Sequence, residues 1–193
     1  MLQKYFLAIV PPEPILSEIQ TIKEYISKHY NSHGALQSPA HITVHLPFTW
    51  EEEKETKLLD CLNGFSFENS INIKLNSFSS FEPRVVFINV EKNEPLFLFQ
   101  QKLVFHVKKN LSIFNQSDNL RGFHPHITIA FRDLKKQVFH KAWDDFKDKN
   151  FNSDHQFDIV VVSSIDEALI KMHAEKEVFI IGGGEIYNQT IGI

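Results

Sequence analysis

Hydrophobic and polar positions divide the chain into short apolar or alternating stretches and longer stretches with helical periodicity. The short stretches predict strands at 5–10, 41–46, 71–75, 85–90 and 126–131. The periodic stretches predict helices at 13–30, from a capping-box pattern at 49–52 to about 63, at 95–111 and at 134–146. Alternating strands are typical of antiparallel sheets with one covered face, so this order of elements predicts an α+β fold.

The last part of the chain, residues 157–193, forms an atypical C-terminal segment. Its pattern predicts a strand, then a helix opened by Ser164 and Glu167, then a strand at 178–181 followed by glycines at 182–184. No low-complexity linker separates any two parts of the sequence. We therefore expect residues 1–193 to form a single domain in which this segment completes a sheet.

Composition and charge narrow the class of protein. The chain has 193 residues, of which 42% are hydrophobic and 23% charged, which is typical of a globular protein and excludes a largely disordered one. The single cysteine cannot form an internal disulfide. The apolar run at 5–10 is too short for a membrane span or a signal peptide, so we expect a cytoplasmic protein without a membrane partner. A net charge of −4 excludes a general polyanion binder, so contact with nucleic acid must use a local pocket.

One four-residue pattern occurs twice. The sequence His-Ile-Thr-Val stands at 41–44 and His-Ile-Thr-Ile at 126–129, and a proline precedes each, Pro39 and Pro125. Side chains alternate between the faces of a strand, so the histidine and the threonine of each copy share one face. The apolar residues on the other face anchor the strand in a core. Two such strands side by side would place two imidazoles and two hydroxyls in one groove.

This set of groups suits the chemistry of phosphate esters. Opening a cyclic phosphodiester needs a base that takes a proton from water and an acid that protonates the departing ribose oxygen. Histidine can fill either role near neutral pH, so His41 and His126 are candidate catalytic residues. The hydroxyls of Thr43 and Thr128 can donate to phosphate oxygens as charge builds in the transition state. The arrangement requires no metal ion and no cofactor.

The two motifs resemble those of the two-histidine (2H) phosphoesterase superfamily, in its 2′-5′ RNA ligase or LigT-like branch, which is defined by paired His-x-Thr/Ser-x motifs. The resemblance extends to Tyr-Phe-Leu-Ala-Ile-Val-Pro-Pro at 5–12 and to Phe-Glu-Pro-Arg-Val-Val-Phe at 81–87, and it covers about residues 3–150. It implies a bilobal domain of two pseudo-symmetric lobes, whose antiparallel β-sheets are flanked by helices and meet at a central groove.

The resemblance also implies an activity. RNA-directed members of the family hydrolyse 2′,3′-cyclic phosphate ends of RNA or related cyclic nucleotides without a metal, and the reverse reaction gives 2′-5′ ligation. By motif, His41 and His126 would be the acid–base pair, while Thr43 and Thr128 would hold the phosphate. We expect His41 to protonate the leaving oxygen and His126 to position water. The expected partner is RNA with a cyclic-phosphate end or a small cyclic nucleotide.

One position departs from the family pattern. Many members place an arginine five residues after the second histidine, where this chain has Phe131. The next residue, Arg132, would point to the opposite face of a continuous strand. Either the strand ends or bulges before it, or Arg121 supplies the positive charge. Both arginines are therefore candidate phosphate ligands, with a solvated surface charge as the alternative for each.

Four other residues near the motifs have more than one interpretation. Phe48 and Trp50 follow the first motif and could stack a nucleotide base or belong to the core. His45 would share the face of His41, and His124 that of His126 if the strand extends back past Pro125, and with the two motif histidines they could form a metal site. Neither motif contains a carboxylate and no zinc-type spacing is present, so we predict no metal.

Two other functions remain open. A non-catalytic RNA- or nucleotide-binding module that kept the groove would also fit the missing arginine and the acidic net charge. In addition, residues 160–169 and 177–189 resemble a fragment of dihydrofolate reductase, in which glycines turn beside the nicotinamide cofactor. The sequence lacks the rest of that fold, so we favour the tail as the end of the second lobe and treat NADPH binding as the alternative.

Overall fold

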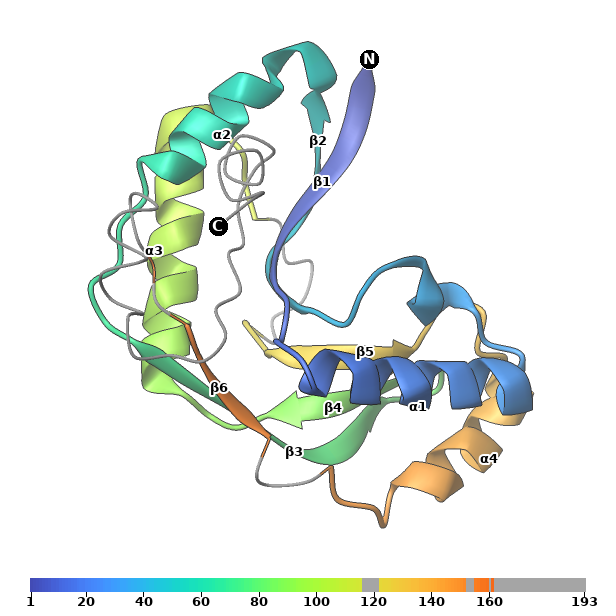
Figure 1. Ribbon diagram of the computed structural model, residues 1–193. Coiled ribbons are helices and arrows are strands. Elements are labelled where there is room, and N and C mark those ends of the chain that lie inside the picture. The colour runs from blue at the N-terminus through green and yellow to red at the C-terminus, as the bar shows by residue number, and fades with distance from the viewer. Residues whose placement is uncertain (116–121, 152–154, 160, 162–193) are drawn as a thin grey trace, which may run out of the picture.

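The computed structural model describes residues 1–115, 122–151, 155–159 and 161 (Figure 1). Its strands are β1 (Leu2–Ile9), β2 (Ile42–Glu51), β3 (Ile71–Phe81), β4 (Val85–Val90), β5 (His126–Ala130) and β6 (Gln156–Ile159). Its α-helices are α1 (Ile15–Tyr30), α2 (Glu55–Asn63), α3 (Glu94–Leu111) and α4 (Lys136–Phe146), and short 3-10 helices span Gly34–Gln37 and Glu52–Lys54. None of these described helices is both long and apolar enough to cross a membrane. Arg121, and the helix, strand and glycines predicted within 162–193, lie outside the described residues.

All six described strands join one antiparallel sheet in the order β1-β2-β5-β4-β3-β6. The strands that carry the two motifs, β2 and β5, are therefore neighbours, paired through Ile42 and Ile127. β1 and β2 run steeply away from β3, β4 and β5, so the sheet bends where β2 meets β5 (Figure 1). The bend places both motifs at the junction between the two parts of the molecule.

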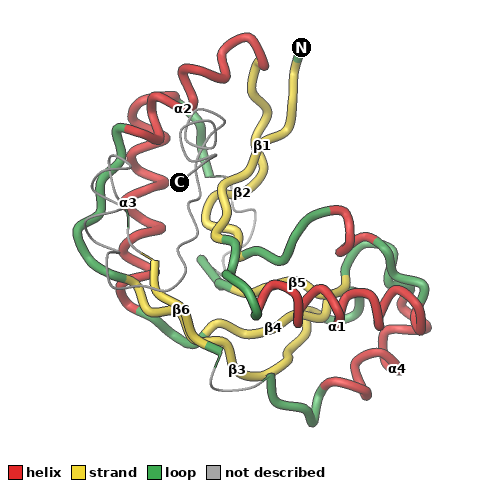
Figure 2. The backbone as a smooth tube through the Cα atoms, viewed as in Figure 1, coloured by secondary structure: helices red, strands yellow, loops and turns green. Residues whose placement is uncertain are grey.

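The α-helices of the described part form two pairs on the two sides of this junction. α1 contacts β5 and α4, and α4 contacts β3, whereas α3 contacts α2, β2 and β3. The tube view shows α1 and α4 together beside β3, β4 and β5, with α2 and α3 on the side of β2 (Figure 2). The predicted α+β fold of two lobes with antiparallel strands flanked by helices is thus confirmed, and the strands of both lobes share one bent sheet.

Apolar faces of the helices and strands meet in one core. In α1, buried isoleucines recur at helical spacing at positions 15, 19 and 26. In the motif strands, Ile42 and Ile127 have no exposed surface. Burying a side chain of this size stabilises the fold by about 1.5–3 kcal/mol. Packing of the isoleucines therefore fixes which face of each motif strand points outward.

The capping box predicted at 49–52 is wrong. Thr49 lies within β2, which continues to Glu51 because its second half pairs with β1, where Lys4 is opposite Thr49. α2 begins only at Glu55, and the preceding Lys54 makes no side-chain capping bond. The backbone hydrogen bonds offered by β1 come from far along the sequence, so a local pattern cannot reveal them. Pairing with β1 overrides the local helix signal.

Candidate active site

The two motifs face each other across the β2–β5 pairing. The isoleucines that follow the two histidines are paired antiparallel, so His41 lies beside Thr128 and Thr43 beside His126. Residues directly opposite each other in such a pair have Cβ atoms about 4.5–5.5 Å apart. All four side chains are partly exposed, whereas the two isoleucines are fully buried. Each histidine therefore shares one outward face with the threonine of the other motif.

The two imidazole rings are held in the same way. Nδ1 of His41 lies 2.9 Å from the carbonyl oxygen of Pro39, and Nδ1 of His126 lies 2.7 Å from that of His124. A carbonyl oxygen can only accept, so each Nδ1 carries the proton and donates it, and each Nε2 keeps its lone pair. In both motifs the acceptor is two residues before the histidine. This shared geometry leaves two unprotonated nitrogens available for proton transfer.

The local sequence accounts for these two contacts. His41 comes directly before β2, and His126 is the first residue of β5. Pro125 has no N–H to donate, which prevents regular ladder pairing from continuing back through it. The carbonyl groups of residues 39 and 124 therefore lie outside the strands and can accept from the imidazoles.

Burial is the main influence on both histidines. It lowers the pKa of His41, while the hydrogen bond to Pro39 opposes this change and the positive charge of Lys23 adds to it. Burial also lowers the pKa of His126, opposed by the hydrogen bond to His124 and strengthened by the positive charges of His124 and His41. Both imidazoles are therefore predominantly neutral at pH 7, and a proton on His41 disfavours a second proton on His126.

Three phenylalanines that the sequence analysis did not single out lie beside the histidines. The ring of Phe6 on β1 lies 5.0 Å from that of His41, and this phenylalanine is 43% exposed. The rings of Phe87 on β4 and Phe81 on β3 lie 4.8 and 5.2 Å from that of His126. Aromatic rings thus flank the face on both sides of the pair of motifs. These contacts depend on how distant strands pair, which no local pattern contains.

Phe48 and Trp50 lie on the core side of β2. The ring centroids of Phe48 and Tyr5 are 6.1 Å apart, and the indole N–H of Trp50 donates to the carbonyl oxygen of Lys54 at 2.9 Å. Both side chains are partly buried and pack against the core. The structure brings Phe6, rather than either of these rings, next to a motif histidine. A base-stacking role for Phe48 and Trp50 stays a prediction.

The expectation that His45 shares a face with His41 is wrong. Register shifts of the β-bulge type interrupt β2 between residues 43 and 48, so that His45, like Val44 before it, turns toward the core. Nδ1 of His45 lies 2.9 Å from the carbonyl oxygen of Leu46. His45 is therefore no candidate ligand for a metal beside the motifs. Within the described residues, no group of three or more His, Cys, Asp or Glu side chains could hold a metal ion.

Arg132 lies in the turn after β5 and not on the strand. β5 ends at Ala130, and Arg132 has a left-handed backbone with a φ of 61°. Its guanidinium lies 5.0 Å from the ring centroid of Phe131, and the residue is exposed. The strand therefore ends before Arg132, which is the first of the two alternatives given by the sequence. A phosphate-binding role stays a prediction for Arg132, and also for Arg121, which lies outside the described residues.

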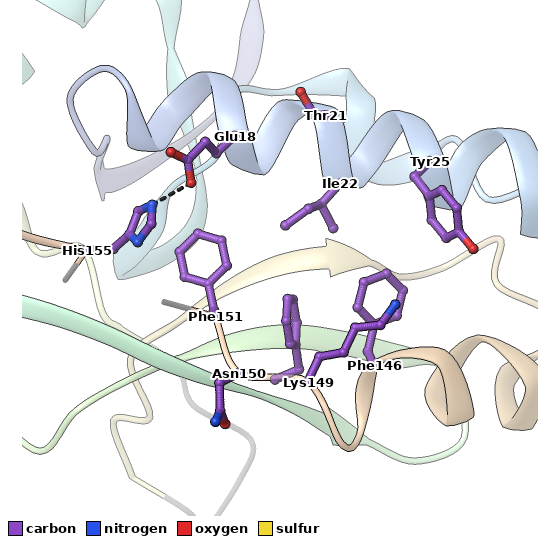
Figure 3. A pocket seen from close by; sticks show the side chains of 10 residues that line it. Glu18, Thr21, Ile22, Tyr25, Phe146, Lys149, Asn150, Phe151 and His155 are labelled. Atoms are coloured by element: carbon purple, nitrogen blue, oxygen red, sulfur yellow. Dashed lines mark hydrogen bonds and ion pairs between the residues drawn. The ribbon is translucent and has the colours of Figure 1, made fainter. Parts of the chain in front are cut away.

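A cavity of about 680 Å³ lies apart from the motifs (Figure 3). Glu18 and Tyr25 of α1 form one wall, and Phe146 and Phe151, at the end of α4 and beyond it, form another. Glu18 also forms a hydrogen bond with His155 across the cavity (Figure 3). No residue of either motif lines this space. The motif histidines lie instead on the partly exposed face at the β2–β5 junction.

Comparison with known proteins places the chain in a family. The sequence matches the 2′-5′ RNA ligase superfamily over residues 11–168, and the chain belongs to this family. The matched region contains both motifs and every described strand except β1. Membership defines an enzyme of the phosphoesterase or RNA ligase type, a class that acts on RNA or nucleotides.

Two solved structures are similar to this one. A crystal structure described as that of a phosphoesterase is 22% identical in sequence, with a TM-score of 0.52, and the alignment covers 69% of this chain and 75% of that chain. The protein TT0787 of Thermus thermophilus is 20% identical, with a TM-score of 0.49 and coverage of 69% and 76%. The first likeness shows a shared fold. No curated protein matches the sequence.

Proposed function

We propose that this protein is a phosphodiesterase that hydrolyses 2′,3′-cyclic phosphate ends of RNA, or related cyclic nucleotides, by acid–base catalysis without a metal ion. The observation that carries the proposal is the geometry of His41 and His126, because neighbouring strands hold both rings as the same tautomer with Nε2 unprotonated. Family membership supports chemistry on RNA or nucleotides. With the 5′-hydroxyl of a second RNA in place of water as the nucleophile, the same two proton transfers would open the cyclic phosphate to a 2′-5′ linkage, with the 3′ oxygen as the leaving group.

The reaction needs one neutral and one protonated imidazole. Nε2 of neutral His126 takes a proton from water as the water oxygen bonds to phosphorus. Nε2–H of protonated His41 gives its proton to the ribose oxygen as the phosphorus–oxygen bond breaks. The product is a phosphomonoester, and exchange with solvent returns the histidines to their starting protonation states. Each of the two proton transfers is worth about 10²–10⁴-fold in rate.

The surroundings of the two rings support this order of roles. Burial lowers the pKa of His126, and the positive charges of His124 and His41 lower it further, so we assign the neutral role in the pair to His126. His41 then keeps that proton. Its lowered pKa makes it a stronger acid toward the leaving oxygen than an ordinary histidine.

Thr43 and Thr128 are the proposed donors to the non-bridging phosphate oxygens. Each threonine lies beside the histidine of the other motif, on the same partly exposed face. A hydroxyl placed there can donate to the oxygens on which negative charge develops in the transition state. Arg132 in the turn after β5, and Arg121 in the segment before that strand, are proposed to add positive charge for the phosphate.

A nucleotide base would stack on Phe6. The ring is partly exposed and lies beside His41, so a base attached to the reacting ribose could reach it. Stacking of a base on an aromatic side chain is worth about 1–3 kcal/mol. This assigns to Phe6 the contact that the sequence suggested for Phe48 and Trp50.

Turnover of 2′,3′-cyclic AMP and of an RNA oligomer with a cyclic-phosphate end, both measured in EDTA, tests the proposal. We expect hydrolysis of at least one of the two substrates at a rate that EDTA does not change. Chromatographic separation of the 2′- and 3′-phosphate products would show which ribose oxygen leaves. Activity that EDTA abolishes and added metal restores would contradict the metal-free reaction.

A nucleotide-binding module without turnover is the second candidate. The position of Arg132 in an exposed turn and the net charge of −4 favour it, because both limit the positive charge available to a phosphate. Calorimetry distinguishes the two candidates. Saturable binding of 2′,3′-cyclic AMP, with no product after prolonged incubation, would favour the binding module.

A further inference from the structure

Lys23 is a buried lysine next to the proposed site. It lies on α1, is only 2% exposed, and donates from Nζ to the carbonyl oxygen of Ser38 at 3.0 Å. Among the described residues no carboxylate forms an ion pair with it. Lysine is almost never fully buried without a charged partner, because its ammonium loses hydration. Burial lowers the pKa of Lys23 to about 8. Because burying its ammonium is unfavourable, we looked for a specific role of Lys23 in the contacts that it makes.

The contact of Lys23 leads directly to His41. Ser38, whose carbonyl oxygen accepts from Lys23, precedes Pro39, whose carbonyl oxygen accepts from the His41 imidazole at 2.9 Å. Ala40, between these contacts and the strand, is buried as well. Lys23 thus holds the backbone one residue before the carbonyl group that fixes the tautomer of His41.

The other end of the same loop is tied down independently. The carboxylate of Asp133 accepts hydrogen bonds from the Ser32 hydroxyl at 2.8 Å, from the Gly34 backbone N–H at 2.9 Å and from the His33 backbone N–H at 2.5 Å. The segment from 32 to 41 is therefore held at its start by Asp133 and near its end by Lys23. Only the second of these contacts lies next to the motif.

The positive charge of Lys23 also contributes to the lowered pKa of His41, but it is not among the causes of the lowered pKa of His126. The charges that lower the pKa of His126 are those of His124 and His41. Lys23 on α1 and His126 on β5 interact electrostatically with His41, and β1 contributes the uncharged ring of Phe6. Lys23 is therefore a chemical difference between two motifs that otherwise share their geometry.

We propose that Lys23 is a positioning residue for His41: its ammonium fixes the backbone at Ser38, next to the Pro39 carbonyl that orients the imidazole, and it places a positive charge near that ring. The proposal rests on the acid role given to His41 above. A cation near the acid favours release of its proton to the leaving oxygen. Lys23 thereby makes protonated His41 a stronger acid toward the leaving oxygen.

Replacing the ammonium by an uncharged side chain tests this role. In Lys23→Met the titration of the His41 Cε1–H signal, followed by NMR and assigned with His41→Ala, is expected to move to higher pH. The alkaline limb of kcat/KM should move in the same direction, and kcat should fall. Lys28→Met removes an exposed lysine from the same helix and should leave the His41 titration unchanged. An unchanged His41 midpoint in folded Lys23→Met would overturn the proposal.

A second variant covers the case in which Lys23→Met does not fold. Lys23→Gln keeps a donor for Ser38 and removes only the charge, so His41 should titrate at higher pH while its Nδ1–H signal keeps its position. The result also separates this inference from the proposed function. If the His41 midpoint shifts but the wild-type protein turns over no cyclic phosphate, the proposed function is contradicted and the positioning role of Lys23 is supported. If the wild-type protein turns over the substrate but neither the His41 midpoint nor the pH profile moves in the variant, the proposed function is supported and the positioning role of Lys23 is contradicted.

Discussion

At the scale of single residues, the two histidines share a tautomer and differ in their surroundings. Both donate from Nδ1 to a carbonyl oxygen two residues earlier, so the repeated motif gives repeated geometry. The charges nearby are not repeated, because Lys23 lies near His41 whereas His124 and His41 surround His126. Residues outside the motifs therefore give the two rings different electrostatic surroundings.

The lowered pKa values predict the pH dependence of kcat/KM. Activity falls at low pH when the base, His126, becomes protonated, and it falls at high pH when the acid, His41, loses its proton. Both pKa values are lowered from the ordinary 6.5, so both limbs of the bell-shaped profile should lie below pH 6.5 and the maximum between them. Initial rates at low substrate over pH 4–9 test this expectation. A maximum above pH 7.5 would contradict it.

The exposed ring beside His41 predicts an effect that depends on the base of the substrate. Phe6→Ala should raise KM for 2′,3′-cyclic AMP by about 5- to 150-fold, since stacking is worth about 1–3 kcal/mol. It should have little effect on a ribose 2′,3′-cyclic phosphate that lacks a base. Phe105→Ala, at a 66% exposed position on α3, is the matched control and should change neither value. An equal effect of Phe6→Ala on both substrates would refute stacking.

At the scale of secondary structure elements, the sequence predicts what local patterns contain. A short apolar run located the strand that became β4, alternation located β5, and helical periodicity located α1 and α3. The pairing of β1 with the second half of β2, the bulges that turn His45 inward and the approach of Phe6 to His41 were missed. Each of these depends on partners far apart in sequence. Lys23 was missed for the same reason, because its partner Ser38 lies on a different element.

The junction between β2 and β5 predicts a strong dependence of stability on one buried side chain. Ile42→Ala should lower the free energy of unfolding by about 2–5 kcal/mol and Ile42→Val by about 0.5–1.5 kcal/mol, because Ile42 is fully buried where the motif strands pair. Leu98→Ala, at an exposed position on α3, should change it by less than about 0.5 kcal/mol. Urea denaturation followed by circular dichroism measures all three. A similar small change in Ile42→Ala and Leu98→Ala would show that the junction is not tightly packed.

At the scale of the whole molecule, the two halves of the chain meet where their repeated strands pair. In the described part of the chain, one six-stranded sheet carries both motifs to this junction, and one pair of helices lies on each side. We propose that residues 1–193 form one bilobal domain, in which the C-terminal segment from 157 begins within β6 at the sheet edge beside β3. The proposed catalytic unit is thus built by both halves together, and neither half holds it alone.

Removal of each motif histidine, separately and together, tests the central claim most directly. His41→Ala and His126→Ala should each lower kcat for the cyclic substrate by about 10²-fold or more, and the double variant should be little slower than either, because the pair acts as a unit. His140→Ala, at an exposed position on α4, should keep wild-type activity, and dispersed amide spectra should show that every variant folds. Activity near the wild-type level in either folded single variant would contradict paired acid–base catalysis.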